Sequence, residues 1–276
     1  MQEDNIREEF EKVIKDLEKH NENGKLTEEQ REKMYELFQE VRNAKNETIK
    51  QIKSDLRKNP DKVEAQMHLA YLTTPNKINL KTKVEKIIKK EHDNLLKKEI
   101  VFEDSVGEYW LIYGTRPYLT ARNDYLSLLL DMGMIRKAVD EAEDIIRLNN
   151  NDNMGVRYRL IHMYAYLEDE ESAKKLYDEY MGNDDVEMNM ALSILYFKLG
   201  DIKKAKSHLI KAQKTNEFVI EFIDDLVDDD VFLSEEEYII HGSKSQLEYM
   251  YEENLFIYDT LTEYSLWAME TLEKRK

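Results

Sequence analysis

Three alanines recur in the second half of the chain at nearly equal intervals. Ala138, Ala173 and Ala205 are spaced close to the period of roughly 34 residues at which helix pairs stack in helical repeat proteins. A small side chain at the same point of every repeat lets neighbouring helices approach closely. This spacing predicts a stack of helix pairs, and it constrains the fold more than any other feature of the sequence.

The positions around the alanines repeat in the same register. Gly133 and Gly200 stand five residues before the first and third alanine, where the chain must turn between two paired helices. Glu168 stands at this place in the middle segment, which weakens the middle match. Larger residues at matching offsets are expected to fill the space between helices: Leu129, Tyr164, Tyr196, Ala142, Tyr177, Leu209, Ile145, Tyr180 and Ala212.

We therefore predict an all-α protein, built as a tetratricopeptide-type right-handed helical solenoid. The clearest repeats should cover about 119–152, 154–182 and 186–216. An apolar helix over about 245–273 is expected to cap the open end of the stack. The sequence has only 8 Gly and 3 Pro against 36% charged residues, and this composition favours long helices with solvated faces.

The N-terminal part is predicted to be a separate charged helical hairpin over 1–58, with the repeat domain over 59–276. Apolar residues at helical spacing predict a first helix from Ile6 to about His20. Thr27 and Gln30 have the spacing of a capping box, so a second helix should begin there and end at Asn59–Pro60, with an interruption near 43–46 as an alternative. This hairpin is thinly apolar, and we expect it either to be mobile or to form a homodimer contact.

Charge and composition exclude several functional classes. The formal net charge of -17 repels phosphate backbones, so we expect no nucleic-acid partner. Residues 77–98 carry eight lysines, and residues 217–237 carry ten acidic side chains without Lys or Arg; both are expected to be solvated surfaces. An acidic run could also attract a cation or a basic partner.

Several kinds of segment and site are missing from the sequence. The chain contains no cysteine, which excludes disulfides and thiolate metal sites. The first ten residues do not resemble a signal peptide, and no apolar run reaches the roughly 18 residues of a membrane span. We therefore expect a cytoplasmic protein with no membrane partner.

The sequence also resembles a family of tetratricopeptide proteins widespread in bacteria, over about residues 59–270. The suppressor-of-tumorigenicity proteins of animals share a similar Thr-Arg-Pro-Tyr start of a repeat. The resemblance rests on Gly107, Trp110, Thr115, Arg116, Pro117, Tyr118, Ala121, Asn151, Asp152, Asn153, Gly155, Gly200, Asp201, His241, Gly242 and Ser243. It implies architecture rather than activity.

A groove is expected on the concave face of such a solenoid, where the first helix of each pair presents residues at helical spacing. In this register the partner-binding groove consists of Asn123, Ser127, Tyr158, His162, Tyr166, Met190, Ile194 and Lys198. Its aromatic and polar mixture suits a peptide, because aromatic side chains lose little entropy on binding. The alternative is that some of these side chains pack under the C-terminal helix.

Two arginines are candidate anchors for an ion pair or a ligand. Arg116 lies at a helix start marked by Pro117 and is expected to form an internal ion pair or to bind a partner carboxylate, with Thr115 as the helix cap. Arg157 follows Asn151–Asn153, whose short polar side chains should cap the helix from Val156. We find no metal-binding, cofactor-binding or catalytic motif.

The function we expect is a non-enzymatic protein- or peptide-binding scaffold or adaptor. The alternative is a peptide-sensing regulatory protein, whose repeat stack changes curvature on ligand binding. A third hypothesis, weaker than these two, places a divalent metal and an enzymatic activity at the carboxylates of residues 224–230.

Overall fold

The structure, a computed structural model, describes residues 27–228 and 239–274. These residues are helical with short connections, and the part of the chain described contains no strand beyond one isolated bridge between Glu108 and Asn149. The all-α prediction is therefore confirmed. The chain separates into two compact units, residues 1–91 and 92–276, and we describe each by itself.

The described part of unit 1 consists of α2 (Glu28–Lys58), α3 (Val63–Thr73) and most of α4 (Lys77–Lys97). The predicted capping box is confirmed, because the amide of Gln30 donates to Thr27 Oγ1 at 3.2 Å and the amide of Thr27 donates to Gln30 Oε1 at 2.9 Å. The helix runs without interruption through 43–46. The predicted first helix, Ile6 to His20, lies outside the described residues.

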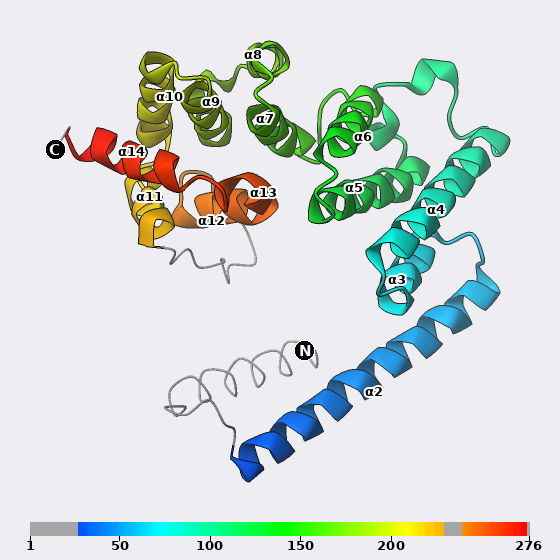
Figure 1. The fold of residues 1–276 in the computed structure, drawn as a ribbon. Coiled ribbons are helices and arrows are strands. Elements are labelled where there is room, and N and C mark those ends of the chain that lie inside the picture. The colour runs from blue at the N-terminus through cyan, green and yellow to red at the C-terminus, as the bar shows by residue number, and fades with distance from the viewer. Residues whose placement is uncertain (1–26, 229–238, 275–276) are drawn as a thin grey trace. The chain divides into compact units, whose positions relative to one another are not determined.

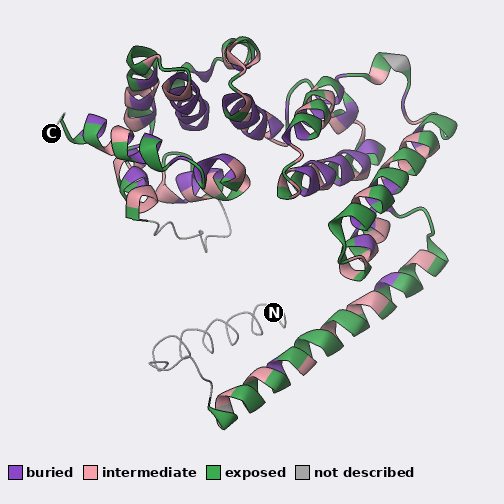
Figure 2. Cartoon of the chain, viewed as in Figure 1, coloured by how far each residue is buried: buried purple, intermediate pink, exposed green. Residues whose placement is uncertain are grey.

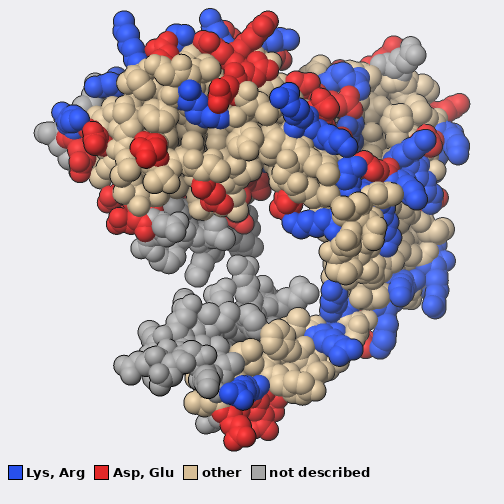
Figure 3. Space-filling model, in the orientation of Figure 1, with Lys and Arg blue, Asp and Glu red and all other residues tan. Residues whose placement is uncertain are grey.

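The predicted domain boundary at 58/59 falls inside unit 1, because α3 packs against α2. Most of α2 is exposed or half-buried (Figure 2), including Tyr35 and Phe38. The homodimer contact expected in this region stays a prediction. All of the lysines on 77–98 except Lys81 are exposed, so this part of the chain is the solvated face that the sequence indicated (Figure 3).

In the described part of unit 2, the helices between residues 116 and 215 follow one another as pairs. The first helix of each pair is strongly buried (Figure 2), and α7 contacts both α6 before it and α9 after it. The pairs are α5 (Arg116–Asp131) with α6 (Ile135–Leu148), α7 (Val156–Leu167) with α8 (Glu170–Glu179), and α9 (Val186–Lys198) with α10 (Ile202–Thr215).

The alanines and the turn positions have the environments that the repeat pattern predicts. Ala138, Ala173 and Ala205 are fully buried. Gly133, Glu168 and Gly200 adopt left-handed backbone conformations with φ of 66°, 60° and 77°. The middle repeat therefore makes the same turn as the others, although it carries a side chain there.

The prediction of one helix over 245–273 is wrong. The structure has α12 (Lys244–Glu253), α13 (Leu255–Tyr258) and α14 (Thr262–Glu273), preceded by α11 (Val219–Asp228). The first break occurs at Asn254, a fully buried residue whose Nδ2 donates to the carbonyl of Met250 at 2.8 Å. Such a side chain competes with the backbone for helix hydrogen bonds.

The C-terminal helices do not simply close the end of the stack. Helix α13 contacts α7, and α14 contacts α10 and α11, so these helices run along the helix pairs (Figure 1). Among the described helices, none has the length and apolar character needed to span a membrane.

Candidate functional site

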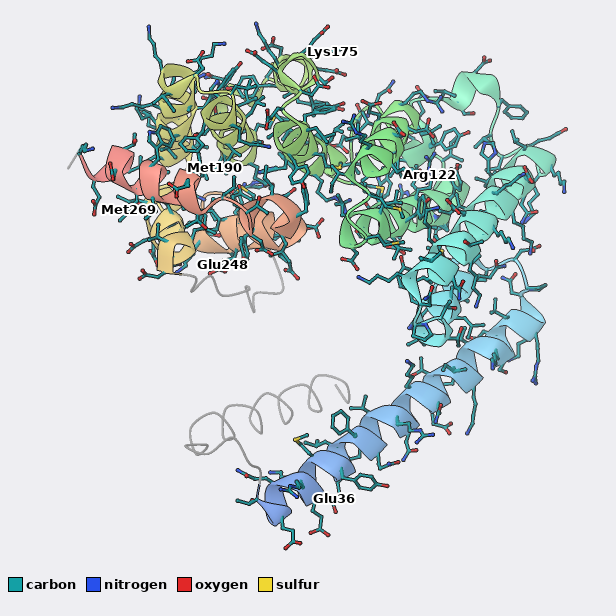
Figure 4. The ribbon with its side chains drawn as sticks, viewed as in Figure 1. Glu36, Arg122, Lys175, Met190, Glu248 and Met269 are labelled. Carbon is teal, nitrogen blue, oxygen red and sulfur yellow. The ribbon has the colours of Figure 1, made fainter. Side chains whose placement is uncertain are left out.

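Three residues of the predicted groove are covered in the structure. His162, Met190 and Ile194 are fully buried, and Met190 lies between α9 and the C-terminal helices (Figure 4). The prediction that they face a partner is therefore wrong. His162 contacts Tyr258 of α13, and Met190 lies beside the C-terminal helices, which agrees with the alternative that the sequence left open.

Specific polar and aromatic contacts hold the C-terminal helices on this face. His162 Nε2 lies 3.1 Å from the Tyr258 hydroxyl, and the Tyr264 hydroxyl donates to Ser193 Oγ at 2.9 Å. The ring of Phe197 lies 5.1 Å from that of Trp267. The hydrogen-bonded partners are buried, and each pair joins a helix of the stack to a C-terminal helix. Helices α13 and α14 are therefore part of the folded core.

Two other predicted groove residues make contacts within the chain, and one of them, Lys198, stabilises a helix end. Lys198 Nζ donates to the carbonyls of Ala165 and Tyr166, at 3.1 and 2.5 Å, and lies 3.5 Å from Glu168. A lysine that binds the last carbonyls of a helix satisfies orphan acceptors and complements the helix dipole. Tyr166 is 37% exposed and its ring lies against that of Phe256.

The remaining groove residues gather around an arginine that the sequence did not single out. Arg159, 5% exposed on α7, donates to Asn123 Oδ1 and to Ser127 Oγ and forms a 3.3 Å ion pair with Glu253 of α12. Asn123 and Ser127 on α5 therefore position Arg159, and Arg159 joins α5, α7 and α12.

A pocket of about 270 Å³ opens beside this arginine. It lies within unit 2 and is formed by α5, the start of α7, the start of α9, α12 and the segment before α12. The residues that line it are Asn123, Met154, Gly155, Tyr158, Arg159, Glu187, Ile239, His241, Tyr249, Glu253 and Asn254. Two predicted residues, Asn123 and Tyr158, therefore belong to a hollow site.

Glu187 is the most unusual group in this pocket. It is 7% exposed, and the structure gives it one weak hydrogen bond, from Gln246 Nε2 at 3.4 Å, without an ion pair among the described residues. Burial and the neighbouring Asp185 raise the pKa of Glu187 to about 8. Burying an unpaired carboxylate is costly, so Glu187 holds a proton at neutral pH.

Asn254 adds a second polar group without a complete set of partners. It lines the pocket and is fully buried, and its Oδ1 has no hydrogen-bond partner among the described residues. Buried amide oxygens are usually paired. Asn254 therefore keeps an unsatisfied amide oxygen within the core, in a residue that also forms part of the pocket wall.

The two predicted arginine anchors both contact other residues of this chain. Arg157 pairs with Asp152 at 3.0 Å and lies over the ring of Tyr158 at 4.2 Å. Arg116 donates to the carbonyl of Trp110 at 3.0 Å and lies 5.1 Å from the centre of its ring, rather than in an ion pair.

Two helix caps were predicted next to these arginines, and only one of them is found in the structure. Asp152 accepts the amides of Val156 and Arg157, at 2.8 and 3.0 Å, so the predicted cap of this helix is confirmed for Asp152. The predicted cap by Thr115 is wrong, because its hydroxyl donates to the carbonyls of Tyr109 and Ile112 instead.

The acidic run is partly neutralised within the chain. Lys244 of α12 pairs with Glu221 at 2.7 Å and with Asp225 at 3.1 Å, both on α11. Over the described part of the chain, His, Asp and Glu side chains form no group of three or more suited to a metal ion. Asp229 and Asp230 lie outside the described residues.

Glu187, Asn254 and Arg159 were not identified from the sequence. Glu187 had one available signal, since it is a carboxylate in the first turn of a helix that is otherwise almost wholly apolar from Val186 to Phe197. Asn254 had none, because the apolar pattern around it continues like that of one helix. Comparisons of the chain with protein-family models, with curated proteins and with solved structures give no match.

Proposed function

We propose that this chain is a non-enzymatic protein that binds a segment of another polypeptide, and that unit 2 is a tetratricopeptide-type stack of helix pairs. Support for the stack comes from the buried alanines and from three left-handed turns at equivalent places. Repeat stacks usually bind partners through the face formed by the first helices of the pairs. In this chain α12–α14 occupy much of that face.

The pocket beside Arg159 and Glu187 is the observation that carries the binding proposal. It is lined by residues of α5, α7 and α9, the first helices of the three pairs, and Arg159 in its wall is held by hydrogen bonds to Asn123 and Ser127. Pockets with a few fixed polar groups and aromatic walls hold one ligand group in one orientation. A single side chain or chain end of a polypeptide fits a volume of about 270 Å³, so the pocket would act as an anchor point.

Selection from a random peptide display library, followed by fluorescence anisotropy with the full chain, tests this proposal. Tyr249→Ala removes a 40% exposed aromatic wall of the pocket. We expect it to weaken the selected peptides about tenfold or more, as aromatic anchors do.

The matched control is Tyr113→Ala, which removes an aromatic ring that is 83% exposed and does not line the pocket. This variant should bind like the wild type. A library that yields no binding peptide, or peptides equally sensitive to both substitutions, would contradict the proposed function.

A further inference from the structure

We propose that the pocket binds a primary ammonium group, with Glu187 and Glu253 as its acceptors. The ammonium group would be carried by a lysine side chain or by the free N-terminus of a polypeptide, and only this choice of carrier rests on the proposed function. An ammonium group offers three donors and one positive charge.

The two carboxyl groups that line the pocket have few hydrogen-bond donors among the described residues. Glu187 receives one long hydrogen bond, from Gln246. The carboxylate of Glu253 is 32% exposed and has a single cation, Arg159, at 3.3 Å. A ligand that brings hydrogen-bond donors would satisfy these oxygens, whereas one that brings acceptors would leave them unsatisfied.

The cations around the pocket are already held by other groups. Arg159 donates to Asn123 and Ser127 in addition to its ion pair with Glu253. Arg157 is paired with Asp152. Glu187 consequently has no ion pair among the described residues, although it is nearly buried, and only the more distant charge of Arg157 favours its ionised form.

An anionic ligand fits this environment poorly. It would enter beside the carboxyl groups of Glu187 and Glu253, with Asp185 close enough to destabilise the charge of Glu187. Like charges at short range in a partly buried site repel strongly. A cation would instead reduce the repulsion that now keeps Glu187 protonated.

This arrangement predicts that binding depends on pH. Burial disfavours the charge of Glu187 most, Asp185 and Glu253 also disfavour it, and Gln246 and Arg157 favour it. Three tyrosine hydroxyls also interact electrostatically with Glu187, those of Tyr158, Tyr249 and Tyr258. Its pKa of about 8 means that the ionised fraction rises about tenfold between pH 7 and pH 9. An ammonium group binds the ionised form, so its affinity should rise by about the same factor.

Isothermal titration calorimetry of the full chain with n-butylammonium chloride tests the inference, with n-butanol as the uncharged analogue. We expect weak binding of the amine, in the range of about millimolar for so few atoms, about tenfold tighter at pH 9 than at pH 7. Glu187→Gln should abolish this pH dependence and weaken binding at pH 9 about tenfold.

The control variant removes the same charge one residue from the pocket. Glu252→Gln acts on an exposed neighbour of Glu253 that does not line the pocket, and should bind the amine like the wild type. Glu253→Gln should weaken binding at both pH values. Amine binding no stronger than that of n-butanol, or binding equal in the Glu187 and Glu252 variants, would overturn the inference.

Two further probes identify the carrier. Nα-acetyl-lysine amide carries its ammonium only on the side chain, and norleucine amide carries it only at the chain start. Both are compared at pH 7, because an α-amino group with a pKa of about 8 is still largely protonated there. Binding of either one supports the inference and names the source. If the amines bind but the display library yields no binding peptide, the proposed function is contradicted and this inference is not. Selected peptides that bind the pocket equally well after acetylation of their amines would remove this inference alone.

Discussion

Asp152 shows how one polar side chain fixes the approach to the pocket. Its backbone φ is 43°, it is 3% exposed, and its carboxylate accepts two amides at the start of α7 and pairs with Arg157. The residues that follow it, Met154 and Gly155, line the pocket. The cap therefore sets both where α7 begins and where one wall of the pocket lies.

Replacing this cap should destabilise the protein. Asp152→Ala leaves the amides of Val156 and Arg157 without a partner, so the free energy of unfolding should fall by about 1–2 kcal/mol. Asn153→Ala changes the exposed neighbour and should alter it little. Urea unfolding followed by circular dichroism gives both values, and equal losses in the two variants would contradict the assignment of the cap.

Glu187 makes a prediction about stability against pH. Its folded pKa of about 8 lies above the ordinary value of 4.5, so the folded state binds more protons between these values and the free energy of unfolding falls as pH rises through this window. Between pH 5 and pH 9 the wild type should lose roughly 4 kcal/mol more than Glu187→Gln.

Urea unfolding of both proteins at a series of pH values isolates this contribution. His162, whose pKa burial lowers to about 4, destabilises the fold as pH falls below about 6.5, but it does so in both proteins. Parallel stability curves for the wild type and the variant would show that Glu187 is not held unpaired.

At the scale of elements, the helix turns explain why the repeat pattern tolerates its one mismatch. Gly133 and Gly200 leave space around an added Cβ, and nothing lies within 4 Å. A side chain at this turn therefore meets little crowding, and its cost comes from the left-handed backbone. Glu168 bears that cost, and its 3.5 Å contact with Lys198 offsets little of it.

Glu168→Gly removes the backbone strain but adds conformational entropy to the unfolded chain. Because the first effect is the larger, the variant should be more stable by about 0.5–1 kcal/mol. Gly200→Ala is the reverse exchange at the equivalent turn and should destabilise by about 1 kcal/mol. Thermal unfolding would detect both shifts. A destabilised Glu168→Gly protein would mean that the Lys198 contact outweighs the strain.

The helix pairs could be predicted from the sequence because their signal is local. Alanine at one offset and a turn former at another follow from how two adjacent helices pack, and Ala138, Ala173 and Ala205 are buried accordingly. The breaks at the C-terminus could not be predicted, since Asn254 ends a helix through burial in a tertiary environment. Apolar spacing alone does not distinguish one long helix from several short ones.

At the scale of the molecule, the same limit explains the predicted groove. His162, Met190 and Ile194 lie on the face that the repeat register identified, but that face is occupied by a segment from the end of the chain. Local periodicity contains no information on which distant element covers a face. Asn123 and Tyr158 were predicted for the same face, and the structure finds them at the pocket, where that face remains open.

The pocket belongs to only one of the two compact units. Unit 1 has a largely exposed α2, whereas the pocket and its polar network lie entirely within residues 92–276. A partner bound at the pocket should therefore affect the amides of unit 2 and leave α2 unchanged.

Hydrogen–deuterium exchange of the full chain, with and without a peptide selected for binding, tests this account most directly. Protection should appear at the start of α7, at the start of α9 and along α12, the three helical segments around Arg159 and Glu187. Protection confined to α2–α4, or to the outer helices α6, α8 and α10, would contradict binding at the pocket.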